Sequence, residues 1–65
     1  MTPAEIKGLE YIRDAGVYAH LEETIDQVGI DVWWKLLQLG FVSRDDRGRV
    51  TLTRIGRAEL AKQAP

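Results

Sequence analysis

The sequence contains no cysteine, and His20 is its only histidine. Disulfide bonds and cysteine-ligated zinc are therefore excluded, and a reducing compartment is the natural setting for such a chain. A zinc site built on histidine would need further ligands of that kind, which the chain lacks. We expect neither a metal ion nor any other cofactor.

Long apolar runs are also missing. No stretch approaches the roughly 18 apolar residues needed to span a bilayer, and the N-terminus lacks the basic and apolar regions of a signal peptide. Hydrophobic residues make up 45 % and charged residues 29 % of the 65 residues, which is typical of a globular protein. The composition predicts one small domain, residues 1–65, that is cytoplasmic and has no membrane partner.

The net charge of −1 conceals a strong asymmetry along the chain. Residues 1–34 carry two basic and seven acidic side chains, a net charge of −5. Residues 35–65 carry seven basic and three acidic side chains, a net charge of +4. One half therefore repels phosphate and the other attracts it, although solvated surfaces also segregate charge without any function.

The N-terminal residues have the pattern of a capped helix. Thr2 is a suitable N-cap, Pro3 fits the first helical position, and Glu5 lies three residues after the cap, as in a capping box. A helix is predicted over residues 3–15. Its core-facing positions and its glycine stop are Ile6, Leu9, Ile12 and Gly16.

Two shorter helices should follow. Val17–Ala19 fits a connector, a minimal strand or the entry to the second helix, which is predicted from residue 19 or 20 to 27, before Gly29. Asp31 is the expected cap of a third helix that continues to Gly40. Two short helices separated by about three residues with a glycine indicate a helix-turn-helix. The apolar positions expected to carry the third helix are Val32, Trp33, Leu36, Leu37 and Leu39.

After Gly40 the pattern changes from helical to alternating. Residues 41–44 and 49–52 flank a turn cluster at residues 45–48, which predicts a β-hairpin. In the second strand, Val50 and Leu52 should point inward while Arg49 and Thr51 point outward.

A last helix is predicted over residues 54–63. Thr53 is its expected cap, Ile55 and Leu60 should face the core, and Pro65 follows its end.

This order of elements, helix, helix, helix, hairpin, helix, is that of a winged helix-turn-helix. Leu36–Arg44 resembles the passage from the recognition helix to the wing in MarR-like bacterial regulators. Residues 45–49 stand where those proteins have the wing tip, and Leu52–Arg57 resembles their LTxxG step into the next helix. The resemblance covers roughly residues 5–63. It implies a mainly α fold with a small β-hairpin and a DNA-binding role in transcription regulation, in bacteria or phages.

Two departures weaken that expectation. MarR-like proteins carry long dimerisation helices at both ends, for which we see no counterpart. Base edges are read by bidentate Arg, Asn, Gln or Lys contacts, but the third helix offers only Asp31, Lys35 and Gln38, interleaved with Trp34 and Leu37. Any sequence preference should therefore be modest.

Arginines gather on or beside the predicted hairpin, where winged domains contact phosphates or the minor groove. The predicted DNA-binding residues are Lys35, Gln38, Arg44, Arg47, Arg49 and Arg54. The alternative is that Arg47 and Arg49 pair with Asp45 and Asp46 as surface ion pairs, each contributing about 0–1 kcal/mol to stability.

Trp33 and Trp34 are adjacent, so on a helix their side chains point about 100° apart. In the winged-helix register Trp33 faces the core and Trp34 lies at least partly outward. Trp34 then either covers the edge of the core or belongs to a contact surface. The predicted protein-interface residues, for a second copy or another protein and without DNA, are Tyr11, Trp34 and Leu37.

No constellation of residues is suited to catalysis. His20 lies at the start of the second helix, near Glu22 and Glu23, where a capping or surface role is expected. Ser43, the only serine, lies in the hairpin without a glycine elbow. We therefore expect a binding protein, with no catalytic residues and no small-molecule substrate.

Overall fold

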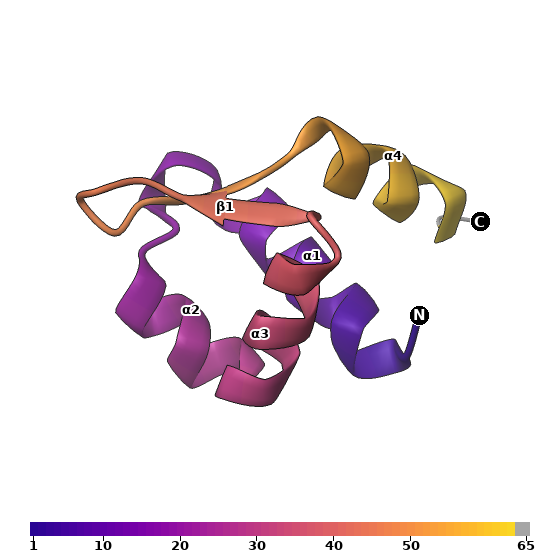
Figure 1. The fold of residues 1–65 in the computed structure, drawn as a ribbon, viewed down its shortest axis with the longest axis horizontal. Helices are drawn as coiled ribbons and strands as arrows, with labels where there is room; N and C mark the ends of the chain where they lie inside the picture. The colour runs from indigo at the N-terminus through magenta and orange to yellow at the C-terminus, as the bar shows by residue number, and fades with distance from the viewer. Residues whose placement is uncertain (64–65) are drawn as a thin grey trace.

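The computed structural model describes residues 1–63 and places helices around a short antiparallel hairpin (Figure 1). The elements are α1 (Pro3–Ala15), the 3-10 helix η1 (Gly16–Tyr18), α2 (Leu21–Val28), α3 (Ile30–Gln38), β1 (Val42–Arg44), β2 (Val50–Leu52) and α4 (Arg54–Gln63). This order confirms the predicted winged helix-turn-helix layout. Pro65, expected after the last helix, lies outside the described residues.

The capping box at the start of α1 forms as predicted. The Thr2 hydroxyl accepts a hydrogen bond from the Glu5 N–H at 3.2 Å, and the Glu5 carboxylate accepts one from the Thr2 N–H at 2.9 Å. Gly16 ends the helix, and Leu9 and Ile12 are buried. Two otherwise unpaired N–H groups are thereby satisfied, which sets the start of α1 at Pro3.

The turn between α2 and α3 is tighter than predicted. Gly29 is both the residue after α2 and the N-cap of α3, with a φ of 95° that favours glycine. The prediction that Asp31 caps the third helix is wrong, because α3 already begins at Ile30. Asp31 lies instead in the first turn, where its negative charge interacts favourably with the helix dipole.

The end of α3 is a Schellman motif. The Phe41 N–H donates to the Leu36 carbonyl at 3.0 Å, and the Gly40 N–H donates to the Leu37 carbonyl at 3.1 Å. Gly40 has a φ of 78°, which turns the chain from the helix into β1. Leu39, counted among the apolar positions of this helix, is 41 % exposed.

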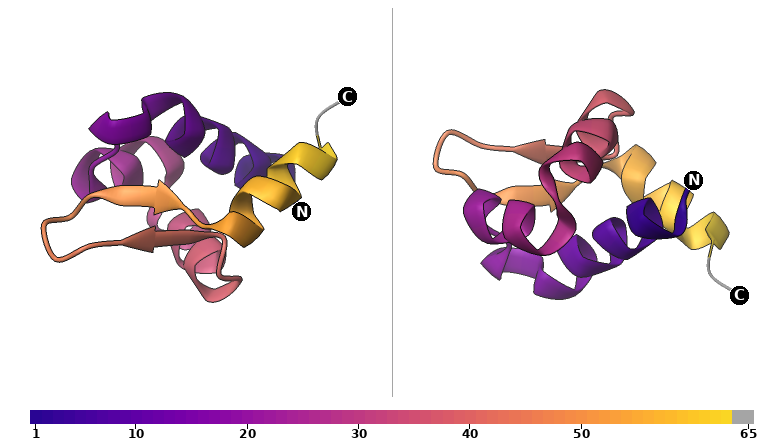
Figure 2. Two further views of the ribbon diagram at one scale, coloured as in Figure 1. Left: turned by 90° about the horizontal axis from the view of Figure 1, so that it is seen from above. Right: turned by 90° about the horizontal axis from the view of Figure 1, so that it is seen from below.

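The segment between α1 and α2 is a connector that adds one bridge to the sheet. After η1, the Ala19 carbonyl accepts from the Val50 N–H at 3.0 Å, and the Leu21 N–H donates to the Gly48 carbonyl at 2.7 Å. His20 and Arg49 form the isolated antiparallel bridge between these bonds. Figure 2 shows β2 lying between β1 and the α1–η1 segment.

In the hairpin, Val42 pairs with Leu52 and Ser43 with Thr51, while Arg44 pairs with Val50. Val50 and Leu52 point into the core, at 1 % and 8 % exposure, as predicted. The outward residues Ser43 and Thr51 share a hydrogen bond between their hydroxyls at 3.0 Å.

Thr53 caps α4 as predicted and also ties it to the end of α3. Its hydroxyl accepts from the Gly56 N–H at 3.0 Å and donates to the Gly40 carbonyl at 2.6 Å. Leu60 faces the core, but the prediction for Ile55 is wrong, because Ile55 is 61 % exposed. Gly56 takes the inward position beside the Phe41 backbone, which turns Ile55 toward solvent.

α1 lies at the centre of the packing, in contact with α2, α3, β2 and α4 (Figures 1 and 2). The buried core draws on α1, α3, α4, both strands and the connector before α2: Leu9, Ile12, Ala19, Trp33, Leu36, Val42, Val50, Leu52 and Leu60. Thr24 is the one buried polar residue of the described chain, and it lies on α2.

Candidate nucleic-acid interface and the adjoining surfaces

The wing tip is ordered by the side chain of Asp45. Its Oδ1 accepts hydrogen bonds from the backbone N–H groups of Arg47 at 2.8 Å and Arg49 at 2.9 Å. The Gly48 N–H closes the turn on the Asp45 carbonyl at 3.1 Å. The bond from the Arg49 N–H, and then that from Arg47, lowers the pKa of Asp45 below its ordinary value, because both stabilise the carboxylate.

This use of Asp45 leaves the wing guanidinium groups free. Among residues 1–63 the ion pairs are Arg13–Asp14 at 2.9 Å and Lys62–Glu59 at 3.7 Å. The alternative in which Arg47 and Arg49 pair with Asp45 and Asp46 is therefore not what the structure shows, since no such ion pair forms among the described residues; the two guanidinium groups lower the pKa of Asp45 only by their nearby charge.

The hairpin carries three of the predicted DNA-binding residues. Arg44 ends β1, Arg47 lies in the turn, and Arg49 precedes β2, all of them exposed. Arg54 does not join them, because it begins α4 at the end of the hairpin away from the tip (Figure 1).

On α3, Lys35 and Gln38 are exposed and three residues apart, so they share a face of the helix. The same two helices also carry acidic side chains: Asp31 on the first turn of α3, and Glu22 and Glu23 on the first turn of α2. The wing, residues 44–49, therefore has a net charge of +1, from three arginines and two aspartates, whereas α2 and α3 together have a net charge of −3.

The outward side of α3 also carries an apolar stripe, formed by Ile30, Trp34 and Leu37 at positions i, i+4 and i+7. Trp34 is 56 % and Ile30 48 % exposed, whereas Trp33 is 4 % exposed and belongs to the core. We call these three residues the α3 stripe. Ile30 was not among the predicted interface residues, because the sequence placed the start of this helix after it.

Tyr11, the third predicted interface residue, lies on α1. Its side chain is half-buried and packs against the core, as does that of Leu37 on α3, and its position on another helix separates it from the α3 stripe. Of the three predicted interface residues, only Trp34 and Leu37 lie on one helix face.

His20 lies next to the backbone of the wing at Gly48 and Arg49. It occupies the N-cap of α2, where its side chain makes no capping hydrogen bond. A Cβ atom on Gly48 would lie only 3.0 Å from His20 Nε2, so the ring packs directly against the wing backbone.

Within residues 1–63, no cluster of three His, Asp or Glu side chains is placed to hold a metal ion. None of the described helices combines the length and the apolar character that crossing a membrane requires.

Comparisons of this chain with protein-family models, with curated proteins and with solved structures found no match.

Proposed function

We propose that this chain is a small DNA-binding winged-helix protein that acts in transcription regulation and contacts phosphates through its wing. The observation that carries the proposal is the wing tip, where the carboxylate of Asp45 binds backbone N–H groups and leaves the guanidinium groups of Arg47 and Arg49 without an ion pair. A cytoplasmic location and a bacterial or phage origin, which the resemblance to MarR-like regulators favours, belong to the same proposal.

Phosphate contact dominates in this proposal. The guanidinium groups of Arg44, Arg47 and Arg49 match phosphate oxygens and release counterions when they bind. Base reading rests on Lys35 and Gln38, and Arg54 adds a phosphate contact only where DNA extends to the start of α4. Binding should therefore depend steeply on salt and weakly on sequence.

The test is fluorescence anisotropy of a labelled random-sequence duplex at about 50 mM and about 200 mM salt. Three wing contacts predict a slope of about −2.7 in log K against log salt, and so a loss of about 40-fold in affinity between the two conditions. The Arg47→Ala/Arg49→Ala variant keeps one of these contacts, so its affinity should fall only about 3- to 4-fold over the same range.

The matched control is Lys7→Ala/Lys62→Ala, which removes the same charge from exposed positions on α1 and α4. It should keep the salt slope of the unaltered protein. Equal affinities and equal slopes for the two double variants would refute the wing as the phosphate-binding element.

A second candidate function is protein interaction through the α3 stripe, with a second copy or with another protein such as a host factor, and without DNA. The observation that favours it is the exposure of Trp34 and Ile30 side by side on one helix face. Clustered exposed apolar side chains are typical of interfaces, and tryptophan is the residue type most enriched among binding hot spots.

Light scattering on the unaltered protein and on Trp34→Ala tests this second candidate. A dimer that becomes a monomer in the variant supports it. Two results together would show that the α3 stripe is not an interface. The unaltered protein would be a monomer at all concentrations, and Trp34→Ala would leave binding to any partner protein unchanged.

A further inference from the structure

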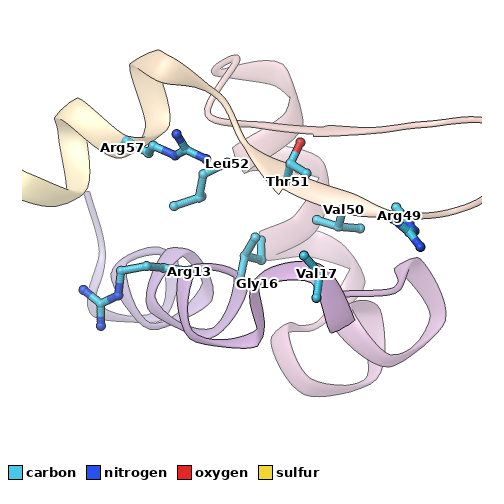
Figure 3. Close-up of a pocket in the computed structure, with 9 residues that line it drawn as sticks. Arg13, Gly16, Val17, Arg49, Val50, Thr51, Leu52 and Arg57 are labelled. Carbon is cyan, nitrogen blue, oxygen red and sulfur yellow. The ribbon is translucent and has the colours of Figure 1, made fainter.

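A groove lies on the side of β2 away from β1. It consists of two adjoining hollows of about 300 Å³ and about 270 Å³ that share Arg13, Leu52 and Arg57. The first hollow extends along β2 to Arg49, and the second extends along α4 to Ala61. Figure 3 shows Arg57 and Leu52 facing Arg13, Gly16 and Val17 across the opening, with Arg49 at the far end.

The groove exists because the third strand of the wing stops early. Ala19 and Leu21 pair with β2 at Val50 and Gly48, but the chain before them turns away as η1. In an antiparallel strand the N–H and C=O groups of residues i and i+2 point to the same side. Since the Val50 N–H points to Ala19, the N–H and C=O of Leu52 point into the groove, where the described chain places no strand beside them.

The charged side chains that line the groove are all arginines: Arg13 and Arg57 line both hollows, and Arg49 lines the first. The remaining lining is mainly apolar, with Ile12 and Leu52 contributing buried side chains. At the rim, Val17 is 75 % exposed, and the neighbouring Tyr18 is 84 % exposed. The groove therefore combines positive charge, an apolar floor and a free strand edge.

From this combination we propose that the groove binds an extended acidic peptide segment of a partner protein, as an added strand beside Thr51 and Leu52. Main-chain bonds to the Leu52 edge supply affinity, and alternate side chains of such a strand point to the floor and to the rim. An aliphatic side chain then covers Ile12 and Val17, while carboxylates meet the guanidinium groups of Arg57 and Arg49, since that of Arg13 is already paired with Asp14. Duplex DNA fits the groove poorly, because it would leave the apolar floor uncovered.

The experiment uses a short fluorescein-labelled peptide of alternating aspartate and leucine with blocked ends, titrated with the full chain. Arg57→Glu should weaken its binding at least about tenfold, because it replaces a charge-assisted contact by repulsion. Arg54→Glu is the matched control: it makes the same charge change on the same helix, outside the groove, and should leave binding within about twofold of the unaltered protein. The amide resonances of Thr51 and Leu52 should shift when the peptide binds.

Three outcomes would overturn the proposal. One is the absence of peptide binding to the unaltered chain at millimolar concentration. Another is equal binding of a lysine–leucine peptide, or equal weakening by Arg57→Glu and Arg54→Glu, which would indicate unspecific attraction. The third is a loss of duplex binding in Arg57→Glu without any peptide binding, which would assign the groove to nucleic acid. Arg49 belongs to both surfaces, but Arg57 lies outside the wing, so the comparison of Arg57→Glu with Arg54→Glu tests the groove whether or not the wing binds DNA.

Discussion

Replacement of Gly56 by alanine should destabilise this protein, although helix propensity predicts the opposite. A Cβ atom at this position would overlap the carbonyl oxygen of Phe41, far inside the 3.0 Å within which real Cβ atoms essentially never meet a non-bonded heavy atom. Because the contact is with the backbone, no side-chain rotation relieves it. The start of α4 must move by more than 1 Å relative to Phe41.

That movement disturbs two sets of contacts. The Thr53 hydroxyl loses its geometry toward the Gly56 N–H and the Gly40 carbonyl, and each such bond contributes about 0.5–1.5 kcal/mol. Leu60, which is 6 % exposed, loses part of a burial that stabilises by about 1.5–3 kcal/mol. The expected loss is about 2–4 kcal/mol, out of a total of about 3–10 kcal/mol for a chain of 65 residues.

Thermal unfolding followed by circular dichroism measures this effect, and Tm should fall by about 10–30 °C. Gly8→Ala is the control, since Gly8 is also a buried helical glycine. Its Cβ atom would meet only side-chain methyl groups, Val28 Cγ1 at 3.0 Å and Leu36 Cδ1 at 3.2 Å, which can move. The free energy of unfolding of Gly8→Ala should stay within about 1 kcal/mol of that of the unaltered protein. A Gly56→Ala protein as stable as the original would refute the reasoning.

Three further predictions concern single side chains. Thr24→Val should raise the free energy of unfolding by about 1 kcal/mol in urea titrations, because the buried Thr24 hydroxyl has no hydrogen-bond partner; Thr24→Ser, which keeps the hydroxyl, should not. Asp45 has a lowered pKa, so its contribution to wing stability is fully present above its ordinary pKa of about 3.8 and is lost as the pH falls through the lowered value. Hydrogen exchange of the backbone amides of Arg47 and Arg49 should accelerate when the pH falls through this lowered pKa. In the Asp45→Ala protein, exchange of these amides should be faster than in the unaltered protein at every pH. Trp34→Ala should shift tryptophan emission to shorter wavelength with a stability change within about 0.5 kcal/mol, whereas Trp33→Ala should cost about 3–5 kcal/mol.

The parts of the fold that the sequence predicted correctly are set by local chemistry. The capping box of Thr2 and Glu5 and the cap by Thr53 each need only residues three positions apart. The alternation that buries Val50 and Leu52 follows from the two-residue period of a strand. Such signals do not depend on the rest of the chain, and tertiary packing did not override them.

One error arose where a distant residue decides the outcome, and the other where two candidate caps lie only two residues apart. Ile55 has the spacing of a core residue, but the approach of α4 to the Phe41 carbonyl places Gly56 inward and Ile55 in solvent. Asp31 has the right chemistry for a cap, but Gly29 allows α3 to start two residues earlier.

The candidate site was predictable only in part. The arginines of the wing are close in sequence, so their grouping follows from the hairpin alone. The arginine groove brings together Arg13 from α1, Arg49 from the wing and Arg57 from α4, and no local motif relates these residues. Ile30 was missed for a different reason: its place on the α3 stripe depends on where the helix begins.

The bonds from Val50 to Ala19 and from Leu21 to Gly48 fasten the second arm of the wing, from its turn to β2, to the connector before α2 and to the first residue of that helix. The wing therefore cannot swing on its own, since any hinge at its base would break the entry to the second helix. A ligand that contacts the wing meets side chains on an already ordered frame and loses less conformational entropy than it would on a free hairpin. By the same coupling, the amides of Val50 and Leu21 should become accessible to solvent together, when wing and helices open as a single unit.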